Sequence, residues 1–237
     1  REFEAKGRRF RTRCDTEVIL AAYAEYGTEC VTRFQGMFAF AIWDREARSL
    51  FLARDRVGIK PIYFADLGGA FVFGSEIKAL FAYPGLGPRL DRDELARYFT
   101  FLCVPPPNTL FEGVRKLRAG HTLTVTERGV GEPRRYWTPI TGPLSVASED
   151  ELAEELRAAL TDSVRARLMS DVPFGAFLSG GVDSSAIVAI MASMLDRPVE
   201  TFSVGYKDDP GFNEFENARR TAKLFGTNHH EVLIDHE

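Results

Sequence analysis

Seven consecutive residues, Ser-Gly-Gly-Val-Asp-Ser-Ser at positions 179–185, combine a backbone and side chains suited to holding a phosphate. They stand between an apolar run at 174–178, typical of a buried strand, and a helix-like stretch at 186–195. A strand that breaks at two glycines and re-enters a helix leaves unpaired backbone N–H groups at the positive end of the helix dipole. We therefore expect phosphate or pyrophosphate to bind there.

The residue types of this segment refine that expectation. Gly180 and Gly181 carry no Cβ, so the backbone can bend sharply and approach an anion closely. The three serines add hydroxyl donors, and Asp183 would repel a bare phosphate, which indicates an Mg2+ between them. The alternative is a glycine-serine turn capping an ordinary helix, but the full pattern in strand–loop–helix context favours a nucleotide. The loop is not of the Walker type, because no lysine follows the glycines.

The second half of the sequence supplies the elements that must position this loop. A helix with leucine or valine at every fourth position is expected over 152–168. Strands and helices then alternate: strand 174–178, helix 185–195, strand 200–205, helix 214–225 and strand 230–234. This alternation predicts a doubly wound parallel sheet, in which ligands bind at the carboxyl ends of the strands.

The first half of the sequence is rich in strands that read as antiparallel. Two predicted strand pairs cover 37–43 with 49–54 and 60–65 with 70–73, the second around Gly68 and Gly69. We expect a helix over 16–26, capped by Asp15 or Thr16 and ended by Gly27, short helices over 76–82 and 92–99, and a strand over 121–126. Residues 139–148 have the composition of a linker, so the halves are predicted to be different domains.

Composition narrows the class of protein. A net charge of −4 gives no electrostatic footprint for nucleic acid. Three scattered cysteines without a Cys-x-x-Cys pair argue against a zinc site or a disulfide framework and favour the cytoplasm. Adjacent His229 and His230 should point to opposite faces of a strand, which disfavours a metal site. No apolar stretch approaches the length of a membrane span. The chain opens without methionine and ends at Glu237, and we expect an internal fragment.

Several segments together resemble the glutamine-hydrolysing asparagine synthetases, and the 179–185 loop resembles the pyrophosphate loop of the ATP pyrophosphatase superfamily. The resemblance covers essentially the whole chain. It rests on Cys-Asp-Thr-Glu-Val at 14–18, Gln-Gly-Met-Phe-Ala-Phe at 35–40, Ala-Arg-Asp-Arg-Val-Gly-Ile-Lys-Pro at 53–61, Gly-Ser-Glu-Ile-Lys-Ala-Leu at 74–80, Asp-Val-Pro at 171–173, Thr-Phe-Ser-Val-Gly at 201–205 and His-His-Glu at 229–231.

The resemblance implies an α+β unit followed by an α/β unit. Residues 1–138 would be the C-terminal part of an antiparallel αββα glutaminase sandwich of the N-terminal-nucleophile type, and 149–237 the start of a doubly wound, ATP pyrophosphatase-type synthetase domain. The implied ligase uses ATP and Mg2+ to adenylate aspartate, and ammonia from glutamine completes asparagine. Its partners would be these small molecules and a second copy in a homodimer, without nucleic acid or membrane.

The resemblance also assigns residues. Asp15 would hold the α-amino group of glutamine, although capping a helix is a sufficient role by itself. Leu178 and Val204 would frame adenine and ribose, and the contacts to ATP and pyrophosphate would be Ser179, Gly180, Gly181, Asp183, Ser184 and Ser185, with Asp183 on Mg2+. No catalytic residue is expected here, because the family's nucleophile is the first cysteine of the mature chain and Cys14 does not match it. The 54–56 Arg-Asp-Arg segment is interpreted as structural, and Glu216 with Arg219 as a surface pair.

Other functions stay open at this point. A related amidotransferase could transfer ammonia to a carboxylate on a peptide, sugar or antibiotic precursor, or a relative could close a β-lactam ring. A non-catalytic, glutaminase-like regulatory protein is disfavoured by the intact 179–185 loop. A superfamily member that thiolates tRNA is disfavoured because catalytic cysteine pairs and basic patches are missing.

Overall fold

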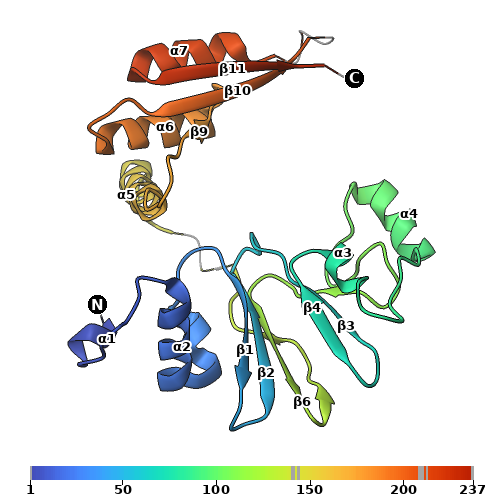
Figure 1. Ribbon diagram of the computed structural model, residues 1–237. Helices are drawn as coiled ribbons and strands as arrows, with labels where there is room; N and C mark the ends of the chain where they lie inside the picture. Colours follow the sequence, from blue (N-terminus) through green and yellow to red (C-terminus); the bar gives the residue numbers. More distant parts are fainter. Residues whose placement is uncertain (1, 140–141, 143–144, 208–210, 212, 236–237) are drawn as a thin grey trace. The chain divides into compact units, whose positions relative to one another are not determined.

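A computed structural model describes residues 2–139, 142, 145–207, 211 and 213–235 and divides the chain into two compact units, Arg1–Gly142 and Pro143–Glu237 (Figure 1). Part of the predicted linker, residues 140, 141, 143 and 144, lies outside the described residues. Unit 1 contains α1 (Glu2–Ala5), α2 (Asp15–Tyr26), the 3-10 helix η1 (Gly27–Arg33), β1 (Ala39–Asp44), β2 (Ser49–Arg54), β3 (Tyr63–Asp66), β4 (Phe71–Gly74), α3 (Ile77–Leu80), α4 (Arg92–Phe101), β5 (Arg115–Lys116), β6 (His121–Thr126), β7 (Gly129–Val130) and β8 (Arg134–Arg135).

Unit 1 is built in four layers, helix–sheet–sheet–helix (Figure 1). One antiparallel sheet has the order β1-β2-β6-β7 with β8 also beside β6, and the other has the order β4-β3-β5. Side chains alternate along β2, so Phe51 packs with α2 and η1 while Leu52 packs with Phe64 of the second sheet. On the far side of that sheet, Ala65 packs with Leu80 of α3. The predicted αββα arrangement and both predicted strand pairs are confirmed.

The start of α2 differs from the prediction. The helix begins at Asp15 itself, its N-cap is Cys14, and no side chain caps it. The prediction that Asp15 or Thr16 caps the helix was therefore wrong. The reason is that Asp15 and Thr16 are already helical, whereas an N-cap residue has an extended backbone. The carboxylate of Glu17, in the first turn, accepts the N–H groups of Arg11 and Thr12 and ties down the preceding segment. These hydrogen bonds hold the pKa of Glu17 below its usual value.

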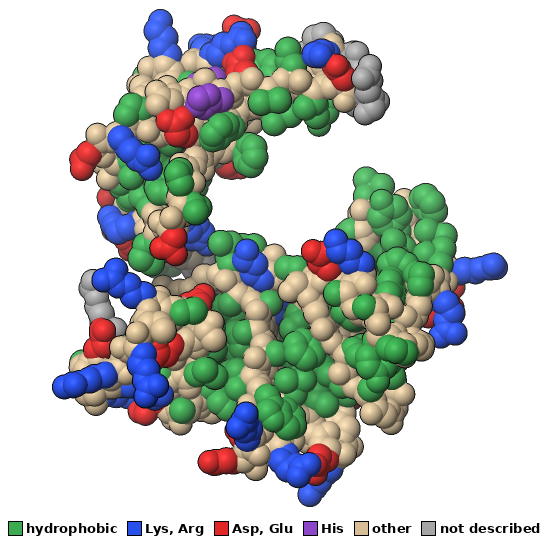
Figure 2. Space-filling view, viewed as in Figure 1, with side chains coloured by type: hydrophobic (Ala, Val, Ile, Leu, Met, Phe, Trp, Pro, Cys, Tyr) green, Lys and Arg blue, Asp and Glu red, His purple; other side chains and the backbone are tan. Residues whose placement is uncertain are grey.

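Not all apolar side chains of unit 1 are in its core. Figure 2 shows apolar side chains gathered on α4, where Phe99, Phe101 and Leu102 are 73%, 60% and 79% exposed. In the described part of the chain, no helix is both long enough and apolar enough to cross a membrane.

Unit 2 is an α/β unit with a parallel sheet, as predicted. It contains α5 (Glu149–Arg167), β9 (Ala176–Phe177), α6 (Val182–Met194), β10 (Glu200–Tyr206), α7 (Phe215–Phe225) and β11 (Asn228–Ile234). The strand order is β11-β10-β9, and all pairs are parallel. Val188 of α6 and Ala218 of α7 share one cluster with Leu178, so both connecting helices cover the same face. On the opposite face, Phe177 and Val204 are 80% and 48% exposed.

Two boundaries in unit 2 differ from the prediction. Helix α6 begins at Val182, so the last four residues of the 179–185 segment form its first turn rather than a free loop. Strand β9 has only two residues, because the chain leaves the sheet at Leu178. The predicted apolar stripe of α5 is buried mainly toward its end, since Leu152 and Leu156 are 41% and 61% exposed and Val164 is 5% exposed.

Candidate nucleotide site

The connection from β9 to α6 has the geometry of an anion-binding turn. Gly180 adopts a positive φ of 78°, and Gly181 is the N-cap of α6 with an extended backbone. A Cβ on Gly180 would lie 2.4 Å from the carbonyl carbon of Asn217 and 2.6 Å from the nitrogen of Ala218, so the turn fits closely against α7. The N–H groups of the first three helical residues have no carbonyl within the helix to bind, so they are available to an anion at this end of α6.

Two of the predicted serines meet across this turn. The hydroxyl oxygens of Ser179 and Ser184 are 3.0 Å apart. The N–H of Gly181 donates to Ser179 Oγ at 3.3 Å, and Ser184 Oγ donates to the carbonyl of Gly181 at 3.3 Å. Ser185 differs, because its hydroxyl lies 3.2 Å from Thr221 Oγ1 of α7 and joins the two helices. The hydroxyls of Ser179 and Ser184 are therefore the ones presented at the turn.

A pocket of ≈ 260 Å³ opens beside this turn at the carboxyl ends of β9 and β10. Four of the predicted nucleotide contacts line it, namely Leu178, Ser179, Ser184 and Val204. The remaining walls include Phe177, Phe202 and Phe215. Aromatic walls next to a few polar groups are typical of small-molecule sites. The structure thus brings both expected walls and the hydroxyl pair together, while Gly180, Gly181, Asp183 and Ser185 do not line the pocket itself.

Asp183 lies exposed in the first turn of α6, where its carboxylate is favoured by the helix dipole. Among the described residues, no group of three or more His, Cys, Asp or Glu side chains could hold a metal ion. This donor set fits an Mg2+ that takes most of its ligands from water and substrate phosphates, because Mg2+ commonly uses one or two protein carboxylates at such sites. It does not fit a site built from protein ligands alone.

The sequence analysis did not identify the polar side chains buried beneath the helices of unit 2. In β10 the residues facing the helices are Thr201, Ser203 and Gly205, of which the first two are 0% and 7% exposed. Phe202 and Val204, between them, face outward. His229 of β11 lies beside this polar row, with Nδ1 3.0 Å from Thr201 Oγ1. The sequence does show that polar and apolar residues alternate along 200–206, and this alternation could have indicated that one face of the strand is polar.

The two adjacent histidines point to opposite faces, as predicted. His229 lies under the helices, whereas His230 stacks on Phe202 on the open face and contacts Glu200 at 2.7 Å. The predicted Glu216–Arg219 surface pair holds in part, because Glu216 attracts Arg219 and helps to raise its pKa, although less than Glu231 does. Arg219 makes a two-pronged ion pair with Glu231 of β11, at 2.8 and 2.6 Å, because that carboxylate offers both oxygens to the guanidinium.

In unit 1, Asp15 is exposed at the start of α2. The one contact found for its carboxylate among the described residues is Cys14 Sγ, 3.5 Å from Oδ1. The capping role that competed with ligand binding is therefore not performed by Asp15. This leaves the carboxylate accessible to a cationic group.

The Arg-Asp-Arg segment builds the fold, consistent with its structural interpretation. Asp55 is 0% exposed, and its carboxylate accepts the N–H groups of Ile59 at 3.0 Å and Lys60 at 2.9 Å. The N–H of Phe38 also donates to it, at 3.3 Å. Arg54 donates to three carbonyls, those of Gly58, Lys60 and Leu117, and burial lowers its pKa. Both charged groups are thus fully engaged inside unit 1.

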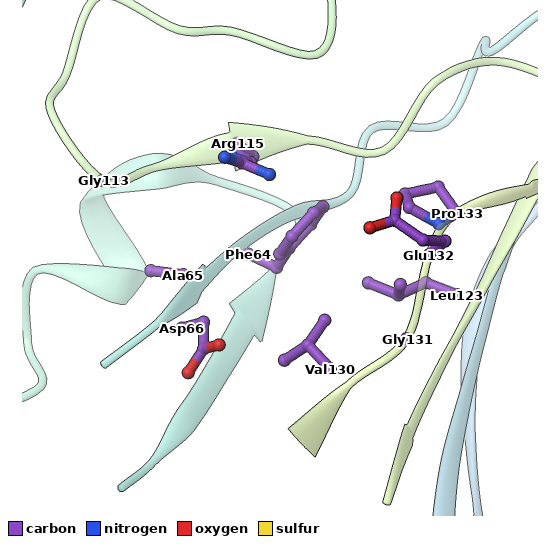
Figure 3. A pocket seen from close by; sticks show the side chains of 10 residues that line it. All are labelled: Phe64, Ala65, Asp66, Gly113, Arg115, Leu123, Val130, Gly131, Glu132 and Pro133. Atoms are coloured by element: carbon purple, nitrogen blue, oxygen red, sulfur yellow. The ribbon is translucent and has the colours of Figure 1, made fainter. Parts of the chain in front are cut away.

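Unit 1 also has a pocket of ≈ 380 Å³ at the edge between its two sheets. Figure 3 shows Phe64 from one sheet and Leu123 from the other on its walls, with Arg115 and Glu132 at its rim. None of the residues predicted to bind a ligand lines this pocket. It therefore gives no support to the site expected from the sequence.

Comparison with known proteins adds independent findings. The family model described as glutamine amidotransferase domain matches residues 1–137, and the one described as asparagine synthase matches residues 155–237. Asparagine synthetase [glutamine-hydrolyzing] 3 of Bacillus subtilis strain 168 is 36% identical over 99% of this chain and 40% of its own length. Asparagine synthetase [glutamine-hydrolyzing] 1 of the same organism is 39% identical over 100% of this chain and 37% of its own length.

Other similarities are more distant. Amidase chry2 of Gibberella zeae is 34% identical over 94% of this chain and 35% of its own length. Among solved structures, the glutamine phosphoribosylpyrophosphate amidotransferase of B. subtilis aligns with 97% of this chain and 41% of its own, at a TM-score of 0.42 and 16% identity. The chain thus spans about 40% of the length of the first curated relatives it matches.

Proposed function

Because the chain belongs to the glutamine amidotransferase family through residues 1–137 and continues into an asparagine synthase sequence, we propose that the protein makes asparagine from aspartate, with ATP and glutamine-derived ammonia. Residues 1–138 contribute to the glutaminase and residues 149–237 to the synthetase. The observation that carries this proposal is the turn between β9 and α6, where Ser179 and Ser184 form a hydroxyl pair and line a pocket at the strand ends, beside the N-terminus of α6.

The chemistry follows from what this turn can stabilise. A carboxylate is a poor electrophile, and transfer of AMP to it creates a good leaving group that ammonia can displace. The pyrophosphate released in that transfer gains negative charge, and fixed donors aimed at such charge lower the barrier. Ser179, Ser184 and the first N–H groups of α6 are those donors in the proposal.

The remaining assignments follow the same scheme. Asp183 would hold Mg2+ shared with the phosphates, and the ion would neutralise their charge. Leu178 and Val204 would frame adenine and ribose, while Gly180 and Gly181 give the backbone its approach to the phosphates. Ser185 supports the first turn of α6 through Thr221. Asp15, exposed and free of a capping role, would bind the α-ammonium group of glutamine.

A second candidate is supported by the similarity to amidase chry2. In this case the same adenylating turn and glutaminase would serve a carboxylate other than aspartate, on a peptide, sugar or antibiotic precursor.

We also propose a cytoplasmic location, consistent with three free cysteines. We further propose a homodimer, which light scattering after size-exclusion chromatography would test.

The test is made on the full-length gene product, supplied with Mg-ATP, aspartate and glutamine, with pyrophosphate and asparagine measured together. We expect equimolar products, their loss in Asp183→Ala and their retention in the control Asp196→Ala at the other end of α6. Asp15→Ala should lose synthesis from glutamine but keep synthesis from added ammonia. Pyrophosphate formed only with another carboxylate selects the second candidate, and no pyrophosphate with any acceptor refutes both.

A further inference from the structure

We infer that His229 is a positioning residue that acts through Ser203 on the peptide unit where β9 becomes the anion-binding turn. The inference rests on the proposed function, because it concerns the same turn. Four side chains and one carbonyl form a continuous series that we call the Thr227–Leu178 chain: Thr227, Thr201, His229, Ser203 and the carbonyl of Leu178.

The series is close and buried over most of its length. Thr227 Oγ1 lies 2.8 Å from Thr201 Oγ1, which lies 3.0 Å from His229 Nδ1. His229 Nε2 lies 3.5 Å from Ser203 Oγ and also 3.5 Å from Glu231 Oε1, a carboxylate oxygen that likewise favours a protonated Nε2. Ser203 Oγ donates to the carbonyl of Leu178. Leu178 is 1% exposed, and the His229 side chain is 11% exposed.

The donor and acceptor of each hydrogen bond can be worked out by starting from the carbonyl of Leu178, at the end of the series. A carbonyl can only accept, so the Ser203 hydroxyl gives its proton to Leu178 and accepts from His229 Nε2. Neutral imidazole then has an unprotonated Nδ1, which accepts from the Thr201 hydroxyl. Thr201 in turn accepts from Thr227. Thr201 and Ser203 therefore each donate once and accept once, Thr227 donates, and one histidine tautomer fits the series.

The end of the series is the peptide unit that begins the turn. Its carbonyl, on Leu178, is bound by Ser203, and its N–H, on Ser179, donates to Ser184 Oγ at 3.3 Å. The plane of this peptide is thus held from both sides. Because Ser184 also faces the Ser179 hydroxyl, rotation of the plane would disturb the hydroxyl pair that the proposed site presents.

A merely structural role makes a different prediction from a positioning role. Buried hydroxyls need hydrogen-bond partners, so removing one hydroxyl from a purely structural series would lower the stability of unit 2 without changing KM for one substrate in particular. If the Thr227–Leu178 chain orients the turn, its loss weakens binding of the phosphates in particular. The Michaelis constants of aspartate and the turnover of glutamine should then stay unchanged.

The experiment uses the full-length gene product and steady-state kinetics with Mg-ATP as the varied substrate. We expect Ser203→Ala to raise KM for Mg-ATP about tenfold, the size expected when one buried carbonyl loses its donor. Ser203→Thr, which keeps the hydroxyl, should return KM to within about threefold of the unaltered protein. The matched control Ser193→Ala removes an exposed hydroxyl from the same unit and should change nothing.

Coupling between residues provides the sharper test. His229→Ala should raise KM for Mg-ATP about as much as Ser203→Ala, and the double variant should be no more than about twofold worse than either, because both break one series. Multiplied effects in the double variant, or an unchanged KM in Ser203→Ala, would overturn the inference. Should Ser203→Ala fail to fold, Thr201→Val carries the same test with an expected rise of about threefold, and an unchanged KM there overturns it equally.

A second readout separates this inference from the proposed function. Amide hydrogen exchange of residues 178–184, measured without nucleotide, should be faster in Ser203→Ala than in Ser193→Ala. If the unaltered protein forms no pyrophosphate, the proposed function fails, and exchange still tests the positioning. Equal exchange in the two variants would overturn the inference whatever the activity.

Discussion

Replacing Gly180 with alanine should damage the turn far more than the same replacement at Gly181. At Gly180 the positive φ of 78° costs an alanine about 1–2 kcal/mol. The new Cβ would also lie 2.4–2.6 Å from backbone atoms of Asn217 and Ala218, an overlap that typically costs about 1–3 kcal/mol. The sum is a loss of roughly 2–5 kcal/mol in the free energy of unfolding of unit 2.

Gly181 provides the matched control one residue away. Its φ is −71°, and an added Cβ would meet one atom, Ser179 Oγ, at 3.4 Å. We expect Gly181→Ala to change the stability by less than about 1 kcal/mol.

The assay must distinguish the two units. Both tryptophans, Trp43 and Trp137, belong to unit 1, so fluorescence follows that unit, while hydrogen exchange of α6 and α7 peptides follows unit 2. In a protein of residues 1–237, Gly180→Ala should accelerate exchange in α6 and α7 and leave the fluorescence transition in place. In the full-length gene product it should abolish pyrophosphate release. Equal stabilities for the two variants would refute the close fit between the turn and α7.

Three further predictions concern other parts of the fold. Asp55→Ala leaves three amide groups without their acceptor and should destabilise unit 1 by about 3–5 kcal/mol, measured by urea unfolding with tryptophan fluorescence. The control Asp66→Ala, in an exposed turn, should cost less than about 1 kcal/mol, and equal costs for the two variants would contradict the buried role of Asp55. Burial raises the pKa of the Cys30 thiol from 9.0 to about 11, so between these pH values the unfolded chain releases a proton that the folded unit keeps. The stability of unit 1 should therefore fall as pH rises through this window, and Cys30→Ala should flatten the fall; an unchanged slope would argue against a buried thiol. Ser148→Ala removes the capping box that Ser148 forms with Glu151 at the start of α5. Thermal unfolding followed by circular dichroism should show that unit 2 loses about 1 kcal/mol of its free energy of unfolding. An unchanged stability would mean that the start of the helix is frayed and the capping box is not formed.

The sequence predicted those features of the fold that depend on local patterns. Strand β6 was found at its observed bounds, since its residues alternate and turn residues flank it. The start of α6 was placed three residues too late, because a glycine-serine segment looks like a loop until the packing of α7 shows where the helix begins. The side-chain cap predicted for α2 is absent, because the helix begins one residue earlier than predicted and its N-cap is Cys14.

The candidate site shows the same division. Ser179 and Ser184 could be predicted from the motif, and the resemblance to asparagine synthetases implied Leu178 and Val204, which lie at the same edge of the sheet. The contribution of His229 could not, since it depends on the register that sets β11 beside β10 and pairs Thr201 with His229. The ion pair of Arg219 with Glu231 was not predicted, because a helical neighbour is visible in the sequence and a carboxylate on another strand is not.

The contact between Gly180 and the start of α7 also bears on the order of events during synthesis of the chain. The turn is completed by Asn217 and Ala218, which are translated more than thirty residues after it. A nascent chain that ends before α7 would carry the whole 179–185 segment and yet lack the wall against which Gly180 takes its shape. Because synthesis adds roughly 5–20 residues per second, this wall follows the turn by seconds, far longer than a single helix turn needs to form. If the turn binds a nucleotide as proposed, this capacity would be acquired late, when α7 and β11 have joined the sheet, and nucleotide could not stabilise shorter, incomplete chains.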